Sequence, residues 1–194
     1  MLTTLQSLKQ ITQAICPLSD EDWEAFSGIW KPLSARRKEI LTVAGEREKY
    51  LYFVIEGVQR VYYFDEQNRE ATLVFTYAPS FGGVIDALML QQPSRYYYET
   101  LTPSVFLRAS VLDLQLLIET RPAIATLMRQ GVTVALSGVL ERLVELQTFS
   151  TEDRYKRLLQ RSPHLLQLVP HKYLANYLGM DATNFSKLIN KIKI

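Results

Sequence analysis

The chain has 194 residues, of which 47% are hydrophobic, and a formal net charge of +2. This composition suits a globular protein with a sizeable core, built as one large or two small domains. A single cysteine excludes an internal disulfide, and with only two histidines beside it we expect no metal site and no cofactor. The amino terminus lacks the apolar core of a signal peptide, and no run approaches eighteen apolar residues. We therefore expect a cytoplasmic protein without a membrane partner.

The first 30 residues are predicted to be helical. Leu5, Leu8 and Ile11 recur at the spacing of one helix face. Ser19, followed by three acidic residues, is a good amino-terminal cap, because its hydroxyl can accept from a free backbone N–H of the first turn. The sequence thus predicts two helices that precede the next region.

Short strands are predicted from residue 33 to about residue 112. This region is rich in β-branched and aromatic residues. Turn signals divide it at regular intervals, at Gly45, Gly57, Asp65 to Asn68, Pro79 and Pro103. Strands of this length and spacing are typical of an antiparallel roll or barrel.

A short helix at Asp113 to Glu119 and a long one that begins near Pro122 are predicted next. Apolar residues along the long helix alternate by four and three, as in a coiled coil: Val132, Leu136, Val139, Leu143 and Leu146. We expect this seam to join two chains in a parallel homodimer. Alternatively, Leu140 and Val144 widen the stripe enough for the helix to pack on the roll of its own chain.

The last twenty-six residues have the spacing of a helix-turn-helix. Ala175 allows two helices to cross closely, Gly179 can adopt a positive φ, and Asp181 can cap the second helix. The expected buried seam is Leu174, Leu178, Met180, Phe185 and Leu188. The expected outward face of the second helix, which a DNA major groove would accept, is Ala182, Thr183, Asn184, Ser186, Lys187 and Asn190. An ordinary helical hairpin would use the same turn and seam.

Charge is distributed unevenly along the chain. Residues 1–119 contain 11 Lys or Arg against 15 Asp or Glu, whereas residues 121–194 contain 11 against 5. A basic carboxy-terminal part is what neutralisation of DNA phosphates requires. No nucleophile-base set and no Gly-rich phosphate loop occurs, so we expect no catalytic residues and no enzymatic activity.

The order of these parts resembles the cyclic-AMP receptor protein and FNR (CRP/FNR) family of bacterial transcription regulators. The segment KEILTVAGEREKYLYFVIEGVQRVYY resembles the family's opening hairpins, with glycines at 45 and 57 and Arg60 on the return strand. The segment beginning TEDRYKRLL resembles the entry to its DNA-binding domain, with Arg154 and Tyr155 on the first helix. The resemblance implies an α+β chain with a sensor roll at 1–120, a dimerisation helix at 121–149 and a DNA-binding domain at 150–194.

Nucleotide-binding members of that family hold the cyclic phosphate with a Gly-Glu pair followed by an Arg. Aligning Phe81 and Gly83 with their cassette places Val84 at the Glu position and Ser94 at the Arg position. Arg95 lies one step along a strand, which points it to the opposite face. On the long helix, Val139 and Leu140 replace a polar pair that contacts the purine. We therefore expect no cyclic-nucleotide binding.

A different small-molecule effector could still enter the roll. The candidate pocket residues are Gly83, Val84, Ser94, Arg95 and Tyr96. The tyrosines at 96, 97 and 98 either line this cavity or pack a strand pair.

The end of the chain departs from the family pattern. The sequence stops soon after the second helix, where larger members have a β-hairpin wing, and Lys187 replaces an Arg that faces a base. The sequence favours a homodimeric DNA-binding transcription regulator of modest affinity. The alternative is a ligand-binding or protein-interaction dimer whose helix-turn-helix does not function.

Overall fold

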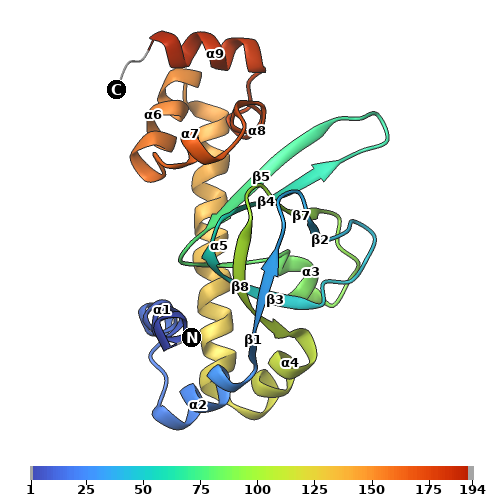
Figure 1. Ribbon diagram of the computed structural model, residues 1–194, viewed down its shortest axis with the longest axis vertical. Helices are drawn as coiled ribbons and strands as arrows, with labels where there is room; N and C mark the ends of the chain where they lie inside the picture. The colour runs from blue at the N-terminus through green and yellow to red at the C-terminus, as the bar shows by residue number, and fades with distance from the viewer. Residues whose placement is uncertain (1, 192–194) are drawn as a thin grey trace.

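The middle of the chain forms two antiparallel sheets of four strands each, which together make the predicted roll. The computed structural model describes residues 2–191 (Figure 1). One sheet contains, in spatial order, β1 (Trp30–Ala35), β8 (Ser104–Ser110), β3 (Tyr50–Glu56) and β6 (Ser80–Gly82). The other contains β2 (Ile40–Thr42), β7 (Tyr97–Thr100), β4 (Val58–Phe64) and β5 (Glu70–Tyr77). The prediction of short strands is confirmed, and β5 is an outer strand of its sheet.

The turn between β3 and β4 requires glycine. Gly57 has a φ of 92°, in the left-handed region that side chains rarely adopt. A Cβ there would lie 2.4 Å from the Ser104 hydroxyl oxygen and 2.6 Å from the Pro103 carbonyl oxygen. The neighbouring β7–β8 connection therefore packs directly against this backbone, which holds the ends of the two sheets together.

The amino-terminal helices pack with the start of the long helix. These elements are α1 (Leu2–Ile15), α2 (Asp20–Gly28), α4 (Val111–Thr120) and α5 (Pro122–Thr148). Ser19 caps α2 as expected, since its hydroxyl accepts from the Asp22 N–H at 3.1 Å. Their common core includes Leu8, Phe26, Leu114 and Ile124, all fully buried. The first third of α5 is thus anchored in its own chain.

The helix α3 (Ile85–Leu90) was not predicted. This six-residue helix follows β6, and its N-cap residue Val84 makes no side-chain capping bond. Its local sequence therefore carries no start signal. Buried contacts of Ala87 and Leu88 with the roll hold it instead, which is a tertiary effect.

Four helices gather beyond the roll at the far end of α5 (Figure 1). They are α6 (Thr151–Arg161), α7 (Leu165–Leu168), α8 (His171–Tyr177) and α9 (Ala182–Lys191). Their core includes Tyr155, Leu174 and Phe185, and it continues into the roll through Val58 and Leu101. Because one apolar cluster spans both parts, the four helices pack against the roll rather than extend freely from α5.

Candidate functional site

Helices α8 and α9 are joined by a tight turn. Gly179 has a φ of 67°, and the Asp181 carboxylate accepts from the Asn184 N–H at 2.8 Å, as a cap should. The seam residues Leu174, Leu178 and Phe185 are fully buried, while Met180 and Leu188 are half-buried. The six residues assigned to the outward face of α9 are all exposed: Ala182, Thr183, Asn184, Ser186, Lys187 and Asn190. α9 thus presents a short polar surface with one cation at Lys187.

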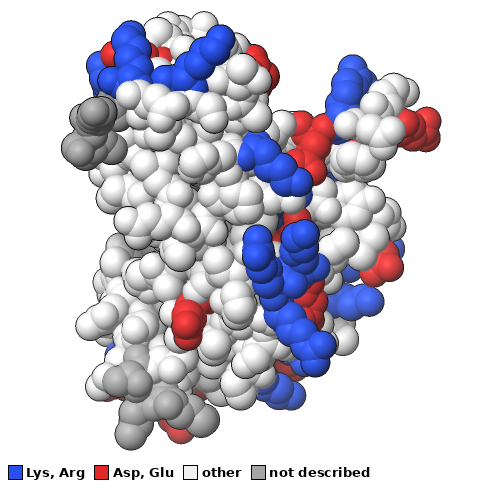
Figure 2. Space-filling model, turned by 45° about the horizontal axis from the view of Figure 1, so that its top comes forward, with Lys and Arg blue, Asp and Glu red and all other residues white. Residues whose placement is uncertain are grey.

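Much of the basic charge of this region is used within the chain. Arg142 and Arg154 are buried, and Arg161 pairs with Glu145 at 2.8 Å. Lys156 and Lys191 pair with Glu152, at 2.9 and 3.1 Å. Figure 2 shows basic side chains grouped over the carboxy-terminal helices at the top of the view, with acidic ones close to them. The charge count of the sequence therefore overstated the cations available to an external partner.

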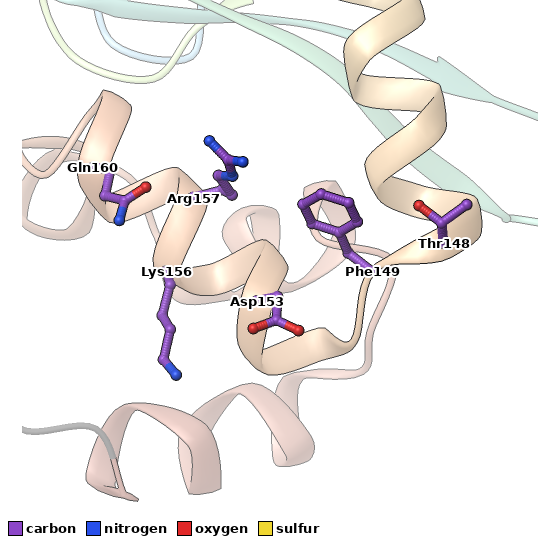
Figure 3. Close-up of a pocket in the computed structure, with 6 residues that line it drawn as sticks. All are labelled: Thr148, Phe149, Asp153, Lys156, Arg157 and Gln160. Carbon is purple, nitrogen blue, oxygen red and sulfur yellow. The ribbon is translucent and has the colours of Figure 1, made fainter.

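An open hollow of about 540 Å³ lies where α5 meets α6 (Figure 3). Its lining residues are Thr148, Phe149, Asp153, Lys156, Arg157 and Gln160. The Arg157 guanidinium lies 5.8 Å from the Phe149 ring centre, a long cation–π contact. Arg157 is exposed and forms no ion pair with any residue in the range 2–191. It is therefore an unpaired positive charge on α6, and in Figure 3 it points away from α9, whereas Lys156 extends toward that helix.

The backbone at Gly83, where the family's phosphate cassette aligns, forms a cradle that contains a carboxylate of the chain itself. Gly83 has a φ of 112°, and the Val84 N–H that follows it donates to Glu48 Oε2 at 3.1 Å. The same oxygen accepts from the Thr42 hydroxyl at 2.5 Å, and Oε1 accepts from the Lys49 N–H at 3.0 Å. Glu48 is only 4% exposed. An incoming phosphate would meet a buried carboxylate where it needs a donor.

Burial raises the pKa of Glu48 above its ordinary value of 4.5, although its hydrogen bonds partly oppose this shift. We expect the stabilising contribution of this group to be complete below that value and to decline as the pH rises through the folded-state pKa. The reason is that the folded protein then binds the proton more tightly than the unfolded chain. Urea unfolding of wild type and Glu48→Gln from pH 4.5 upward isolates the effect. Parallel pH profiles of the two proteins would contradict it.

The interior of the roll beside this cradle is filled by side chains. Tyr98 is fully buried, and its hydroxyl hydrogen-bonds Thr76 at 2.8 Å. A Cβ on Gly82 would lie 2.3 Å from that hydroxyl, so Tyr98 touches the β6 backbone. Tyr52 packs against Tyr98 with ring centres 5.5 Å apart, and Phe106 packs against Tyr52 in turn, at 5.6 Å. Tyr98 therefore fills the roll, whereas Tyr97 stacks on Tyr62 at 5.1 Å.

The other candidate pocket residues do not form one site. Val84 is buried, and its N–H is already bonded to Glu48. Ser94 is buried in its own loop, where its hydroxyl accepts from the Tyr96 N–H at 3.0 Å and donates to the Tyr96 carbonyl at 2.7 Å. Arg95 is exposed, and Tyr96 is half-buried. The described contacts bring no cation to Gly83.

The second half of α5 carries an apolar stripe that its own chain leaves uncovered. The predicted seam residues Leu136, Val139, Leu143 and Leu146 are 55, 51, 47 and 39% exposed. Leu140 and Val144 are also exposed, so this part of the helix does not pack on the roll of its own chain. α5 is the one helix within residues 2–191 that is long and apolar enough to cross a bilayer, on length and composition alone. Buried Arg142 and Glu145 in its last turns are unfavourable in such a span.

Comparison with known proteins identifies the roll. Residues 32–121 match the family model of the cyclic nucleotide-binding domain. FixK2 from Bradyrhizobium japonicum superposes with a TM-score of 0.74 at 16% identity, over 84% of each chain. A protein from Eubacterium rectale assigned to the CRP/FNR family gives a TM-score of 0.72 at 14% identity, over 90% of this chain and 83% of the other. The chain has the fold of a CRP/FNR-type regulator.

The same fold occurs in the c-di-GMP-responsive global regulator CLP of Xanthomonas campestris. It superposes with a TM-score of 0.67 at 18% identity, over 89% of this chain and 91% of that one. No curated protein sequence matches the chain significantly. The CRP/FNR resemblance inferred from the sequence is thus confirmed, while the identities are too low to transfer a ligand or an operator.

Sequence reasoning missed the residues that fill the cradle and attach α8. Glu48 lies 36 residues before Val84, and no local motif connects them. Asn176 was assigned no role, yet its side chain hydrogen-bonds the β5 backbone at Glu70 and Thr72. Both contacts join distant segments, so only the folded chain reveals them. Glu48 stands among the charged residues Glu46, Arg47 and Lys49 between β2 and β3, so its charge alone did not single it out.

Proposed function

We propose that the chain is a homodimeric, sequence-specific DNA-binding transcription regulator, in which α8 and α9 form a helix-turn-helix. The observation that carries this proposal is the exposed polar face of α9 on a chain with the CRP/FNR fold. Side chains of this size and polarity fit the floor of a major groove, and Lys187 adds a positive charge on the same face. The division into a roll, a dimer helix and a DNA-binding part is included in the proposal. Catalysis is not.

Salt-dependent binding of duplex DNA tests this function. Selection from a randomised duplex pool at about 0.1 M salt should yield a preferred sequence, and affinity should fall as salt rises because phosphate contacts release counterions. Lys187→Ala should weaken binding of that sequence by about 1–3 kcal/mol if the lysine contacts a base. A uniform loss over all sequences would make it a phosphate contact.

Lys49→Ala is the matched control, because Lys49 is an equally charged, exposed residue on the roll that pairs only weakly with Glu46 at 3.9 Å. It should leave DNA binding unchanged. If the wild-type dimer selects no sequence, the regulator proposal fails and the alternative dimer with a non-functional helix-turn-helix stands.

We further propose that the roll binds neither cyclic AMP nor cyclic GMP. The family's Arg is absent, Glu48 occupies the Val84 N–H, and Tyr98 fills the interior. Burying a cyclic phosphate against an unpaired carboxylate is strongly unfavourable. Calorimetry with each nucleotide should give no binding. A dissociation constant of about 10 μM or tighter, lost when Ser94 or Arg95 is changed, would show that the cassette is wrongly aligned.

A further inference from the structure

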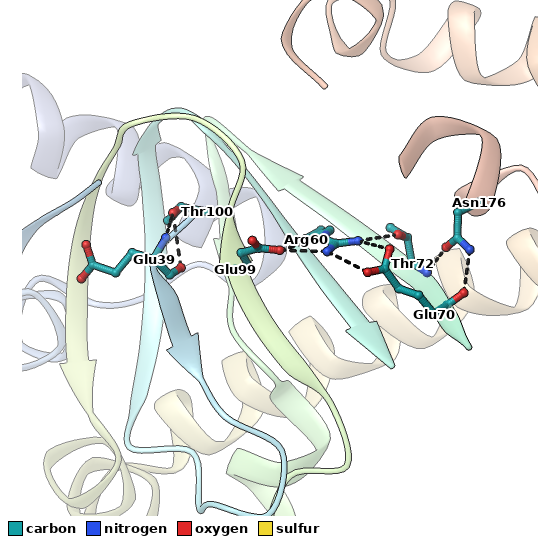
Figure 4. A network of polar contacts seen from close by, with 7 residues as sticks. All are labelled: Glu39, Arg60, Glu70, Thr72, Glu99, Thr100 and Asn176. Carbon is teal, nitrogen blue, oxygen red and sulfur yellow. Dashed lines mark hydrogen bonds and ion pairs between the residues drawn. The ribbon is translucent and has the colours of Figure 1, made fainter. Parts of the chain in front are cut away.

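The outer edge of β5 is bonded by one side chain of α8. β5 is the last strand of its sheet, so its outward backbone groups have no strand partner. Asn176 Nδ2 donates to the Glu70 carbonyl oxygen at 2.6 Å, and Asn176 Oδ1 accepts from the Thr72 N–H at 2.5 Å (Figure 4). A side-chain amide carries the same donor and acceptor as a peptide. Asn176 therefore attaches α8 to the sheet as one residue of a further strand would.

A buried arginine strengthens the same contact. The Arg60 guanidinium lies 4.0 Å from the Tyr62 ring centre and 3.7 Å from that of Tyr173, which belongs to α8. Arg60 Nε donates to Glu99 at 2.9 Å, and Nη1 donates to Glu70 at 2.8 Å (Figure 4). Because two carboxylates of the roll hold the guanidinium in place, Tyr173 packs on a guanidinium face whose position is fixed. We call the Asn176 and Tyr173 contacts with the roll the α8–β5 contact.

The α8–β5 contact matters because the backbone joint to α5 is short and extended. Phe149 and Ser150, between α5 and α6, have ψ angles of 146° and 158°. On the α5 side, Arg142 donates to the Tyr177 carbonyl, and Glu145 pairs with Arg161. The helices are thus held at two places, to α5 and to β5. Two attachments fix an orientation that one attachment leaves free to rotate.

We propose that Asn176 is a positioning residue that fixes α9 relative to the roll and thereby sets the half-site spacing a dimer accepts. The inference rests on the proposed DNA-binding function. α9 follows α8 after a short turn and shares its core through Phe185, so the orientation of α8 determines that of α9. In a two-fold dimer the separation of the two α9 helices must match half-sites about 34 Å apart. When α8 is no longer held to β5, the distance between the two α9 helices varies over a wider range.

The test uses Asn176→Ala and Asn176→Asp in the full-length dimer. Aspartate keeps the size and the acceptor for Thr72 but replaces the donor to the Glu70 carbonyl by an oxygen. Gln167→Ala is the control, since it removes an exposed amide from α7. Thermal unfolding establishes that every variant is folded before binding is compared.

Two measurements follow. Spin labels at Ser186→Cys, on a Cys16→Ala background, report the distance between the two α9 helices without DNA. We expect one narrow distance in wild type and in Gln167→Ala, and a broad distribution in both Asn176 variants. Duplexes carrying the selected half-site at graded spacings report the function. Wild type should prefer one spacing by about tenfold, and the Asn176 variants should lose most of this preference while they keep their affinity for a single half-site.

Three results would overturn the positioning role. They are a narrow distance in the Asn176 variants, an unchanged spacing preference, or an equal loss at every spacing including the single half-site. Failure of the underlying function looks different, because the wild-type protein itself would then bind no duplex selectively. The control Gln167→Ala would then also bind no duplex selectively.

Discussion

Leu143→Asp is expected to convert the proposed dimer into a monomer. Leu143 lies in the middle of the apolar stripe of α5 and is 47% exposed in the single chain. Burying each large apolar residue of such a seam contributes about 2 kcal/mol, and in a two-fold interface one substitution acts twice. Two carboxylates would also be buried without partners. The protomer should still fold, because this position is not part of its own core.

Sedimentation at micromolar concentration measures the change. Leu116→Asp is the matched control, because Leu116 is an exposed leucine on α4, outside the stripe. It should remain a dimer. A wild-type chain that sediments as a monomer would contradict the dimer directly, and a monomeric Leu116→Asp would place the interface elsewhere.

The elements were predictable because their signals are local. Ser19 caps α2 where expected, and Pro122 begins α5. Glycine at 57 ends one strand because its φ and its contact with Ser104 admit nothing larger. α3 was not predictable in this way, since its N-cap position carries no capping side chain and buried contacts alone hold it.

The candidate site was likewise predictable from the sequence only where its signals are local. The outward face of α9 follows from helical periodicity, and its six residues are exposed. The departure from the family's nucleotide cassette was visible at Val84 and Ser94, but the side chains that surround Gly83 were not. Glu48 reaches the cradle at Gly83 from the connection between β2 and β3, and Tyr98 reaches it from β7. Similarly, the basic excess of the last third was counted correctly, yet burial and ion pairing could not be read from the count.

Arg60→Met is expected to destabilise the folded protein by about 3–5 kcal/mol, because it leaves a buried ion pair without its cation. The Arg60 side chain is 3% exposed, and that of its partner Glu99 is 11% exposed. Burial alone would lower the pKa of Arg60, but Glu70 and Glu99 outweigh it and raise that pKa, so the group is charged. Methionine keeps most of the volume, and the loss therefore reports the charge rather than a cavity.

Urea unfolding at one fixed protein concentration provides the comparison, with Arg69→Met as the control. Arg69 pairs with Asp65 at 2.6 Å, but its side chain is 77% exposed, so we expect it to lose less than about 1 kcal/mol. Adding Glu99→Gln to Arg60→Met should restore part of the stability, since the unpaired carboxylate is then removed. Equal small losses in both arginine variants would show that the Arg60 network is no stronger than a surface pair. In that case the attachment of α8 to β5 would depend mainly on Asn176.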